Sequence, residues 1–262
     1  ENRIEPACFD NEVIIQETME RDFRRRLFDP ADNPDATNEL VALRESWKEE
    51  VTPVTTVFTV GVYDLMHLSH RAYLLNTKVQ GAPRHYSEHY AERIGLDWNE
   101  LGLEYQTELA SQFILNGELR QIVSVDGNTN VARRKGFNPE KGNVARPILD
   151  WQTRARDVAG AALHGSDHSV PRADAVTTHD PYEYEGTAHA HWSSLVPAIK
   201  PEVWSVNHES EDIIEAVSHD PRFEGIELRL IDDKQYYFDG MIGRFSTTSI
   251  IERAKNGSAK IT

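Results

Sequence analysis

Two histidines three residues apart are the side chains whose type and spacing most clearly suggest chemistry. They are His67 and His70, in the segment Gly61-Val62-Tyr63-Asp64-Leu65-Met66-His67-Leu68-Ser69-His70. Side chains three apart share one face of a helix, and a helix N-terminus offers free N–H groups and partial positive charge to an anion. Two imidazoles there can donate hydrogen bonds to phosphate oxygens and stabilise the charge that develops when phosphorus is attacked.

The elements that must position these histidines follow from the residue pattern. Residues 54–60 are β-branched and apolar, which predicts a buried strand. A helical pattern then runs from about His67 to Lys78. In parallel α/β sheets, ligands bind beyond the carboxyl ends of the strands. Gly61, which permits close approach of a ligand to the backbone, stands at that end.

The remainder of the chain repeats the alternation of strands and helices. Further strands are predicted at 121–126, 173–178, 202–206 and 226–231, and helices at 150–163, 191–199, 209–217 and 246–255. Five alternating strands predict an α/β, Rossmann-like five-stranded parallel sheet with helices on both faces. We expect two parts: a helical N-terminal arm at 1–52, and a domain at 53–262 with a helical insertion at about 79–119. In the arm, helices are predicted at 11–28 and 37–50, with Thr37 as N-cap.

The composition of the 262-residue chain restricts the class of function. A formal charge of −15 argues against a nucleic-acid partner, because binding a phosphate backbone needs a clustered basic surface. No apolar run approaches the roughly 20 residues that a membrane helix needs, so no membrane partner is expected. Cys8 is the one cysteine, which rules out an internal disulfide and favours a cytoplasmic protein.

Two segments resemble the cytidylyltransferase-like nucleotidyltransferases, in particular the glycerol-3-phosphate cytidylyltransferase type. Residues 58–70 resemble the family signature G-x-(F/Y)-D-x-x-H-x-G-H, with Ser69 where the family usually has Gly. The matching residues are Gly61, Tyr63, Asp64, His67 and His70. Residues 243–253 resemble the closing motif G-x-S-T-T-x-I-I-x-R-I. Three weaker matches, at 126–136, 150–158 and 200–207, lie between them in the family's order.

This resemblance implies a set of functional residues. It assigns catalysis to His67, His70 and Arg244. It assigns nucleotide binding to Val60, Gly61, Tyr63, Asp64, Arg134, Lys135, Arg154, Asn207, Ser246, Thr247 and Thr248. Arg244 takes the place of an Arg that the family carries at the position of Met241.

The implied activity is transfer of CMP or AMP from a nucleoside triphosphate to a small phosphorylated or phosphonylated acceptor, with release of pyrophosphate. CTP is favoured over ATP, and Mg²⁺ enters on the triphosphate. The acceptor could be a polyol phosphate, a sugar 1-phosphate or a phosphonate. We expect the insertion at 79–119 to select it.

Several alternatives stay open. The departures at Ser69, Asn207 and Met241 suit a nucleotide-binding sensor or assembly module with weakened catalysis. A class I aminoacyl-tRNA synthetase relative is less favoured, because the chain is short and acidic and lacks a K-M-S-K-S-like loop. Asp64 could contact Mg²⁺, but a cap of the turn is favoured. Zinc ligation or simple surface exposure of the two histidines is less favoured than phosphate binding, and residues 1–52 are a candidate homodimer interface.

Overall fold

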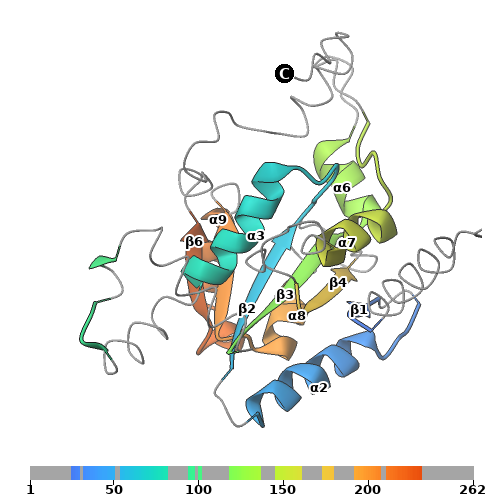
Figure 1. The fold of residues 1–262 in the computed structure, drawn as a ribbon. Helices are drawn as coiled ribbons and strands as arrows, with labels where there is room; N and C mark the ends of the chain where they lie inside the picture. Colours follow the sequence, from blue (N-terminus) through green and yellow to red (C-terminus); the bar gives the residue numbers. More distant parts are fainter. Residues whose placement is uncertain are drawn as a thin grey trace, which may run out of the picture.

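The protein folds around one parallel β-sheet with helices on both faces (Figure 1). The computed structural model describes residues 25–29, 32–50, 54–81, 94–97, 100–101, 118–136, 145–160, 173–179, 192–207 and 211–231. Within them the sheet has six strands, in the order β1-β4-β3-β2-β5-β6. Every pair of neighbouring strands is parallel. The predicted α/β, Rossmann-like class is therefore confirmed.

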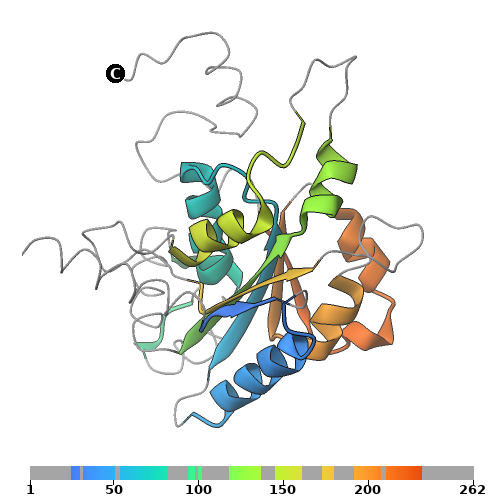
Figure 2. The same cartoon turned by 90° about the vertical axis from the view of Figure 1, so that its right-hand side faces the viewer.

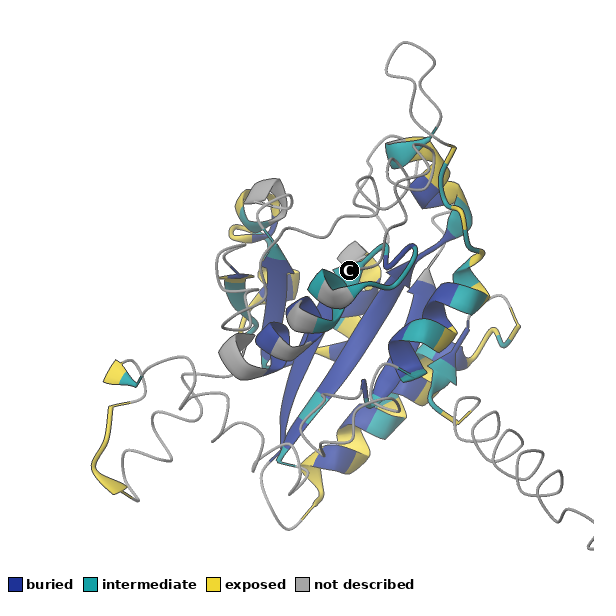
Figure 3. Ribbon diagram, turned by 45° about the horizontal axis from the view of Figure 1, so that its top comes forward, coloured by how far each residue is buried: buried dark blue, intermediate teal, exposed yellow. Residues whose placement is uncertain are grey.

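Five of the six strands are those predicted from β-branched and apolar runs. Their bounds are β2 (Thr55–Gly61), β3 (Leu119–Asp126), β4 (Ala175–His179), β5 (Val203–Asn207) and β6 (Glu227–Ile231). The described side chains of β2, β3, β4 and β5 are mostly buried, as expected for parallel strands covered on both faces (Figure 3).

The sixth strand corrects two predictions, the number of strands and the extent of the first helix. Leu27 and Phe28, expected at the end of a helix, form β1 and pair with Val176 and Thr177 of β4. The Val176 N–H donates to the Arg26 carbonyl at 2.8 Å, and the Thr177 hydroxyl donates to the Phe28 carbonyl at 2.8 Å. Two residues are too few to show alternation, and their partner lies far along the chain. Residues 11–24 of that predicted helix lie outside the described part.

The helices form two layers, visible when the sheet is seen nearly on edge (Figure 2). One face is covered by α3 (Leu68–Gly81) and α7 (Trp151–Gly160), and the other by α2 (Ala36–Lys48) and α8 (Trp192–Ile199). The remaining elements are α6 (Asn128–Lys135), α9 (Glu211–Val217) and the 3₁₀ turn η4 (Pro221–Phe223). No helix in the described ranges has the length and apolar character required to cross a membrane.

The start of α2 differs slightly from its prediction. Asp35, not Thr37, is the N-cap residue, and Thr37 lies within the first turn. The reason is a turn just before the helix, in which the Asp35 N–H donates to the Asn33 side chain at 3.0 Å. The Ala36 N–H donates to the Asn33 carbonyl at 2.9 Å, and the helix begins at Ala36.

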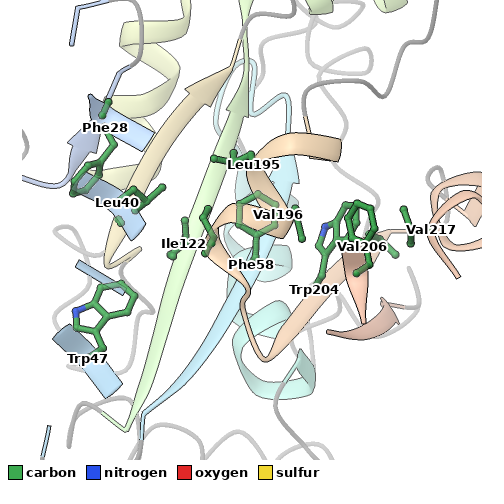
Figure 4. Packing of buried hydrophobic residues seen from close by; sticks show 14 of the residues in the cluster. Phe28, Leu40, Trp47, Phe58, Ile122, Leu195, Val196, Trp204, Val206 and Val217 are labelled. Carbon is green, nitrogen blue, oxygen red and sulfur yellow. The ribbon is translucent and has the colours of Figure 1, made fainter. Parts of the chain in front are cut away.

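Residues of the predicted arm share a hydrophobic core with the sheet (Figure 4). Leu40 and Trp47 of α2 belong to the same buried cluster as Ile122 of β3. In that cluster the ring of Trp204 packs edge-on against Phe58, with centroids 6.2 Å apart, and stacks on Phe223 at 5.9 Å. The described part of residues 1–52 is thus a structural layer of the domain. Most of the helical insertion predicted at about 79–119, and all of the helix predicted at 246–255, lie outside the described residues.

The strand order fixes where a ligand site is expected. From β2 the chain moves outward through β3 to β4, then returns to the other side of β2 to form β5 and β6. The carboxyl ends of β2 and β5 therefore flank the point where the direction of winding reverses. Crevices at such points are the usual ligand sites of open α/β sheets. Gly61 and Asn207 are the last residues of these two strands.

Candidate functional site

The loop that follows β2 has an unusual backbone. Tyr63 and Leu65 have positive φ angles of 51° and 54°, a region that non-glycine residues enter at a cost of about 1–3 kcal/mol. The buried Tyr63 ring folds back over Gly61, so that a Cβ atom at position 61 would lie 2.7 Å from two ring carbons. A side chain at Gly61 would therefore displace Tyr63. Strained backbone of this kind is typical of loops that position a site.

The two predicted histidines lie together at the end of this loop. His67 directly precedes α3, and His70 lies in its first turn. Their rings are stacked, with centroids 3.8 Å apart and planes inclined by 21°. The Tyr63 ring meets His70 edge-on at 5.6 Å. The expected shared face is thus confirmed, and the strained loop supplies one of its walls.

The surroundings keep both imidazoles neutral at pH 7. Burial, and then the positive charge of Arg146, lower the pKa of His67. Burial lowers the pKa of His70 to about 3, helped by His67, Arg146 and Lys135 and opposed by Asp64. A neutral imidazole has one N–H donor and one acceptor nitrogen. The pair can therefore donate hydrogen bonds to an anion that Arg146 and Lys135 attract.

Three buried imidazole nitrogens have no hydrogen-bond partner within the part of the chain that the structure describes. They are Nδ1 and Nε2 of His67 and Nδ1 of His70. A buried polar atom without a partner costs about 1–3 kcal/mol, and most such atoms in native proteins are satisfied. Three of them at one point favour a site completed by a ligand that carries oxygen atoms.

Arg146 is a residue of this site that sequence reasoning missed. Its Nε donates to Asp64 Oδ2 at 2.9 Å, and its side chain is 13% exposed. In the sequence it is one basic residue in a stretch before the predicted helix at 150–163, and nothing in its spacing marks it. Only the fold brings it to the histidines.

Asp64 anchors the loop that carries Arg146, which revises the favoured reading of Asp64 as a cap of its own turn. Its fully buried carboxylate accepts hydrogen bonds from Arg146 Nε and from the N–H groups of Ile148 and Leu149, the latter two at 3.1 Å. Both oxygens are therefore engaged by N–H donors, an environment that suits a structural carboxylate better than a Mg²⁺ ligand. Within the described ranges, no cluster of three or more His, Cys, Asp or Glu side chains could hold a metal ion.

Arg154, predicted to contact the nucleotide, makes three contacts within the protein, and its contact with a nucleotide stays a prediction. Its side chain is fully buried, and its guanidinium donates to the Val62 carbonyl at 2.7 Å, the Asn128 side chain at 2.9 Å and the Leu149 carbonyl at 3.1 Å. It joins the loop after β2, the start of α6 and the loop before α7. Through these contacts, Arg154 links the segments that surround the site. Asp150, at the start of the helix predicted at 150–163, caps α7 by accepting the Thr153 N–H at 2.7 Å.

The other predicted residues divide into three groups. Lys135, the last residue of α6, is close enough to His70 to act on it electrostatically. Val60 is partly buried and packs against the core, and Asn207 ends β5 at the winding reversal. Arg134 lies on α6, but its side chain is outside the described part, and so are Arg244, Ser246, Thr247 and Thr248.

Comparison with known proteins adds no assignment. No model of a known protein family matches the chain. No curated protein matches its sequence either. The resemblance of residues 58–70 and 243–253 to nucleotidyltransferases therefore stays a prediction from motif.

Proposed function

We propose that this protein is a nucleotidyltransferase that transfers CMP, or AMP, from a nucleoside triphosphate to a small phosphorylated or phosphonylated acceptor. The observation that carries this proposal is the stacked, neutral His67–His70 pair, whose buried nitrogens lack partners at the carboxyl end of β2. Arg146 and Lys135 place positive charge beside it. A ligand with several negatively charged oxygens satisfies both features.

The chemistry follows from the state of the imidazoles. In the proposed reaction, an oxygen of the acceptor attacks the α-phosphorus in line, the bond to the β-phosphate oxygen breaks, and pyrophosphate leaves. Charge builds on the oxygens around phosphorus, and N–H donors already in place stabilise it without reorganisation. Because positioning and charge stabilisation supply the catalysis, no covalent enzyme intermediate is needed.

We propose that the substrate is the Mg²⁺ complex of the triphosphate. Asp64, the carboxylate nearest in sequence to the histidines, already accepts from three N–H groups. Mg²⁺ would therefore be carried by the phosphates. CTP is preferred over ATP on the motif resemblance, and Asn207 at the end of β5 is the described residue that we expect near the base.

The proposal is tested by pyrophosphate release. Purified protein with Mg²⁺ is incubated with CTP or ATP and a panel of polyol phosphates, sugar 1-phosphates and phosphonates. Release with at least one pair, lost in a His67→Ala variant, supports transfer. Tight nucleotide binding without release across the panel would favour the second candidate, a sensor or assembly module, to which Ser69 and Asn207 already point. Absence of nucleotide binding would refute both.

A further inference from the structure

The guanidinium of Arg146 is only partly used by the protein. Its Nε is held by Asp64 at 2.9 Å. Within the described residues, no hydrogen bond or ion pair joins its Nη1 or Nη2 to another group. A guanidinium has a planar fork of N–H groups that can bind two oxygens of one phosphate at once. Occupation of Nε therefore leaves the two terminal nitrogens available to an anion.

The position of this fork is fixed by two separate tethers. Asp64 binds Arg146 and the backbone N–H groups of Ile148 and Leu149. Arg154 binds the Leu149 carbonyl and the Val62 carbonyl. The loop before α7 is thereby tied to the loop after β2 through both Asp64 and Arg154. A donor set in place before the ligand arrives loses little conformational freedom on binding.

The Arg146 guanidinium and the two imidazoles also share a lack of hydrogen-bond partners among the described residues. Three imidazole nitrogens are buried without partners, and the charge of Arg146 acts on both rings. Among the described groups that act on His70, Asp64 carries the one negative charge, and Arg146 already pairs with it. The N–H donors and the positive charge that remain suit an anion.

We propose that Arg146 is the phosphate clamp of this site, gripping the polyphosphate chain of the nucleoside triphosphate through Nη1 and Nη2 while Asp64 orients it through Nε. This inference rests on the proposed function, and it adds which part of the nucleoside triphosphate supplies most of the binding affinity. Recognition lies first in the phosphates, and the nucleoside contributes less. Asp64 is a positioning residue, because it touches Arg146 and not the substrate.

The test compares Arg146→Gln, Arg146→Lys and a matched control, Arg222→Gln. Arg222 lies in η4, just before the amino end of β6, whereas Arg146 acts at the carboxyl ends of the strands. Arg222→Gln removes the same charge as Arg146→Gln. Isothermal titration uses inorganic triphosphate, CTP, ATP and cytidine. Arg146→Gln is expected to weaken triphosphate, CTP and ATP binding by about 10- to 100-fold, as for a lost charged hydrogen bond. Arg146→Lys should lie between, cytidine should be unaffected, and Arg222→Gln should match the wild type.

Loss of folding must be separated from loss of the clamp. Arg146→Gln leaves the Asp64 carboxylate buried without its cation, so the double variant Asp64→Asn/Arg146→Gln, which buries no charge, is measured in parallel. The same loss of triphosphate binding in the folded double variant supports the clamp. In the wild type labelled with ¹⁵N-arginine, triphosphate should shift the Arg146 Nη signals more than its Nε signal.

The possible outcomes distinguish failure of the Arg146 clamp from failure of the proposed function. A folded Arg146 variant that binds triphosphate as tightly as the wild type overturns the clamp and leaves the proposed function standing. A wild-type protein that binds neither triphosphate nor nucleotide overturns both. Binding that depends on Arg146 but never yields pyrophosphate supports the clamp and counts against transfer.

Discussion

The two ends of the sheet both contain buried charged groups, but they use them differently. At the amino end, Lys78 is 1% exposed and pairs with Asp174 at 3.2 Å, and Arg44 pairs with Glu202. Asp174 also accepts the Gln121 N–H at 2.7 Å, and Glu202 accepts the Thr56 N–H at 2.8 Å. At the carboxyl end, Nδ1 and Nε2 of His67, Nδ1 of His70 and the terminal nitrogens of Arg146 have no partner among the described residues. Arg44 Nε also lacks a partner at the amino end, but the Arg44 guanidinium is paired there through a terminal nitrogen. Charges paired within the protein stabilise the fold, and we propose that the donors without partners at the carboxyl end bind a ligand.

The largest expected effect concerns stability at the amino end. Lys78→Met keeps much of the side-chain volume but removes the buried cation beside Asp174, which then retains, among the described residues, only the Arg120 cation at 3.6 Å. The free energy of unfolding should fall by up to about 3 kcal/mol. Urea denaturation measures this change. Triphosphate binding at a temperature where the variant is folded should be unchanged. A folded Lys78→Met protein that no longer binds triphosphate would erase the distinction between the two ends.

The reverse pattern is expected at the carboxyl end. His67→Ala should lower pyrophosphate release by at least about a hundredfold, as when an enzyme loses one donor to a developing oxyanion. Its free energy of unfolding should change little, because His67 makes no hydrogen bond that would be lost among the described residues. Steady-state kinetics and denaturation of the same preparation measure both quantities. Full activity in both His67→Ala and His70→Ala would contradict the assignment.

The pH dependence of stability sharpens the contrast further. The folded-state pKa of His70, about 3, is lower than the ordinary value of 6.5. The unfolded chain therefore takes up a proton between these values and the folded protein does not, so stability is fully present above about pH 6.5 and falls as the pH drops toward 3. The slope from one such group approaches about 1.4 kcal/mol per pH unit. Denaturation from pH 7 to 4 should show a weaker dependence in His70→Gln than in the wild type, and identical slopes would contradict the burial of a neutral His70.

The smallest effect is expected for the other cation of the site. Lys135→Gln removes a charge that acts on His70 from the end of α6. Lysine is a flexible point charge without a fixed fork. Triphosphate affinity should fall by a factor of about two to five, as for an exposed ion pair, and the difference should shrink in high salt. A loss as large as that of Arg146→Gln would show that the tethered fork has no special role.

The success of sequence reasoning followed the range of the interactions involved. Strands β2 to β6 were predicted because each carries its own apolar run, and His67 and His70 because a local turn and helix bring them together. The two-residue β1 was missed, since its pairing with β4 is purely tertiary. Arg146 was missed, and the contacts of Arg154 within the protein were not foreseen, for the same reason. Which arginine is buried among carbonyls and which keeps a free fork depends on loops joined across 80 or more positions.

The most direct test of the account observes the two imidazoles themselves. Two-bond ¹H–¹⁵N spectra of histidine-labelled protein, assigned with His67→Ala and His70→Ala, report the charge and the hydrogen bonding of each ring. The account predicts neutral rings at pH 7 whose nitrogen signals shift when MgCTP or MgATP is added at millimolar concentration, together with pyrophosphate release once a suitable acceptor is present. Signals of both rings that stay unchanged under saturating nucleotide would contradict it.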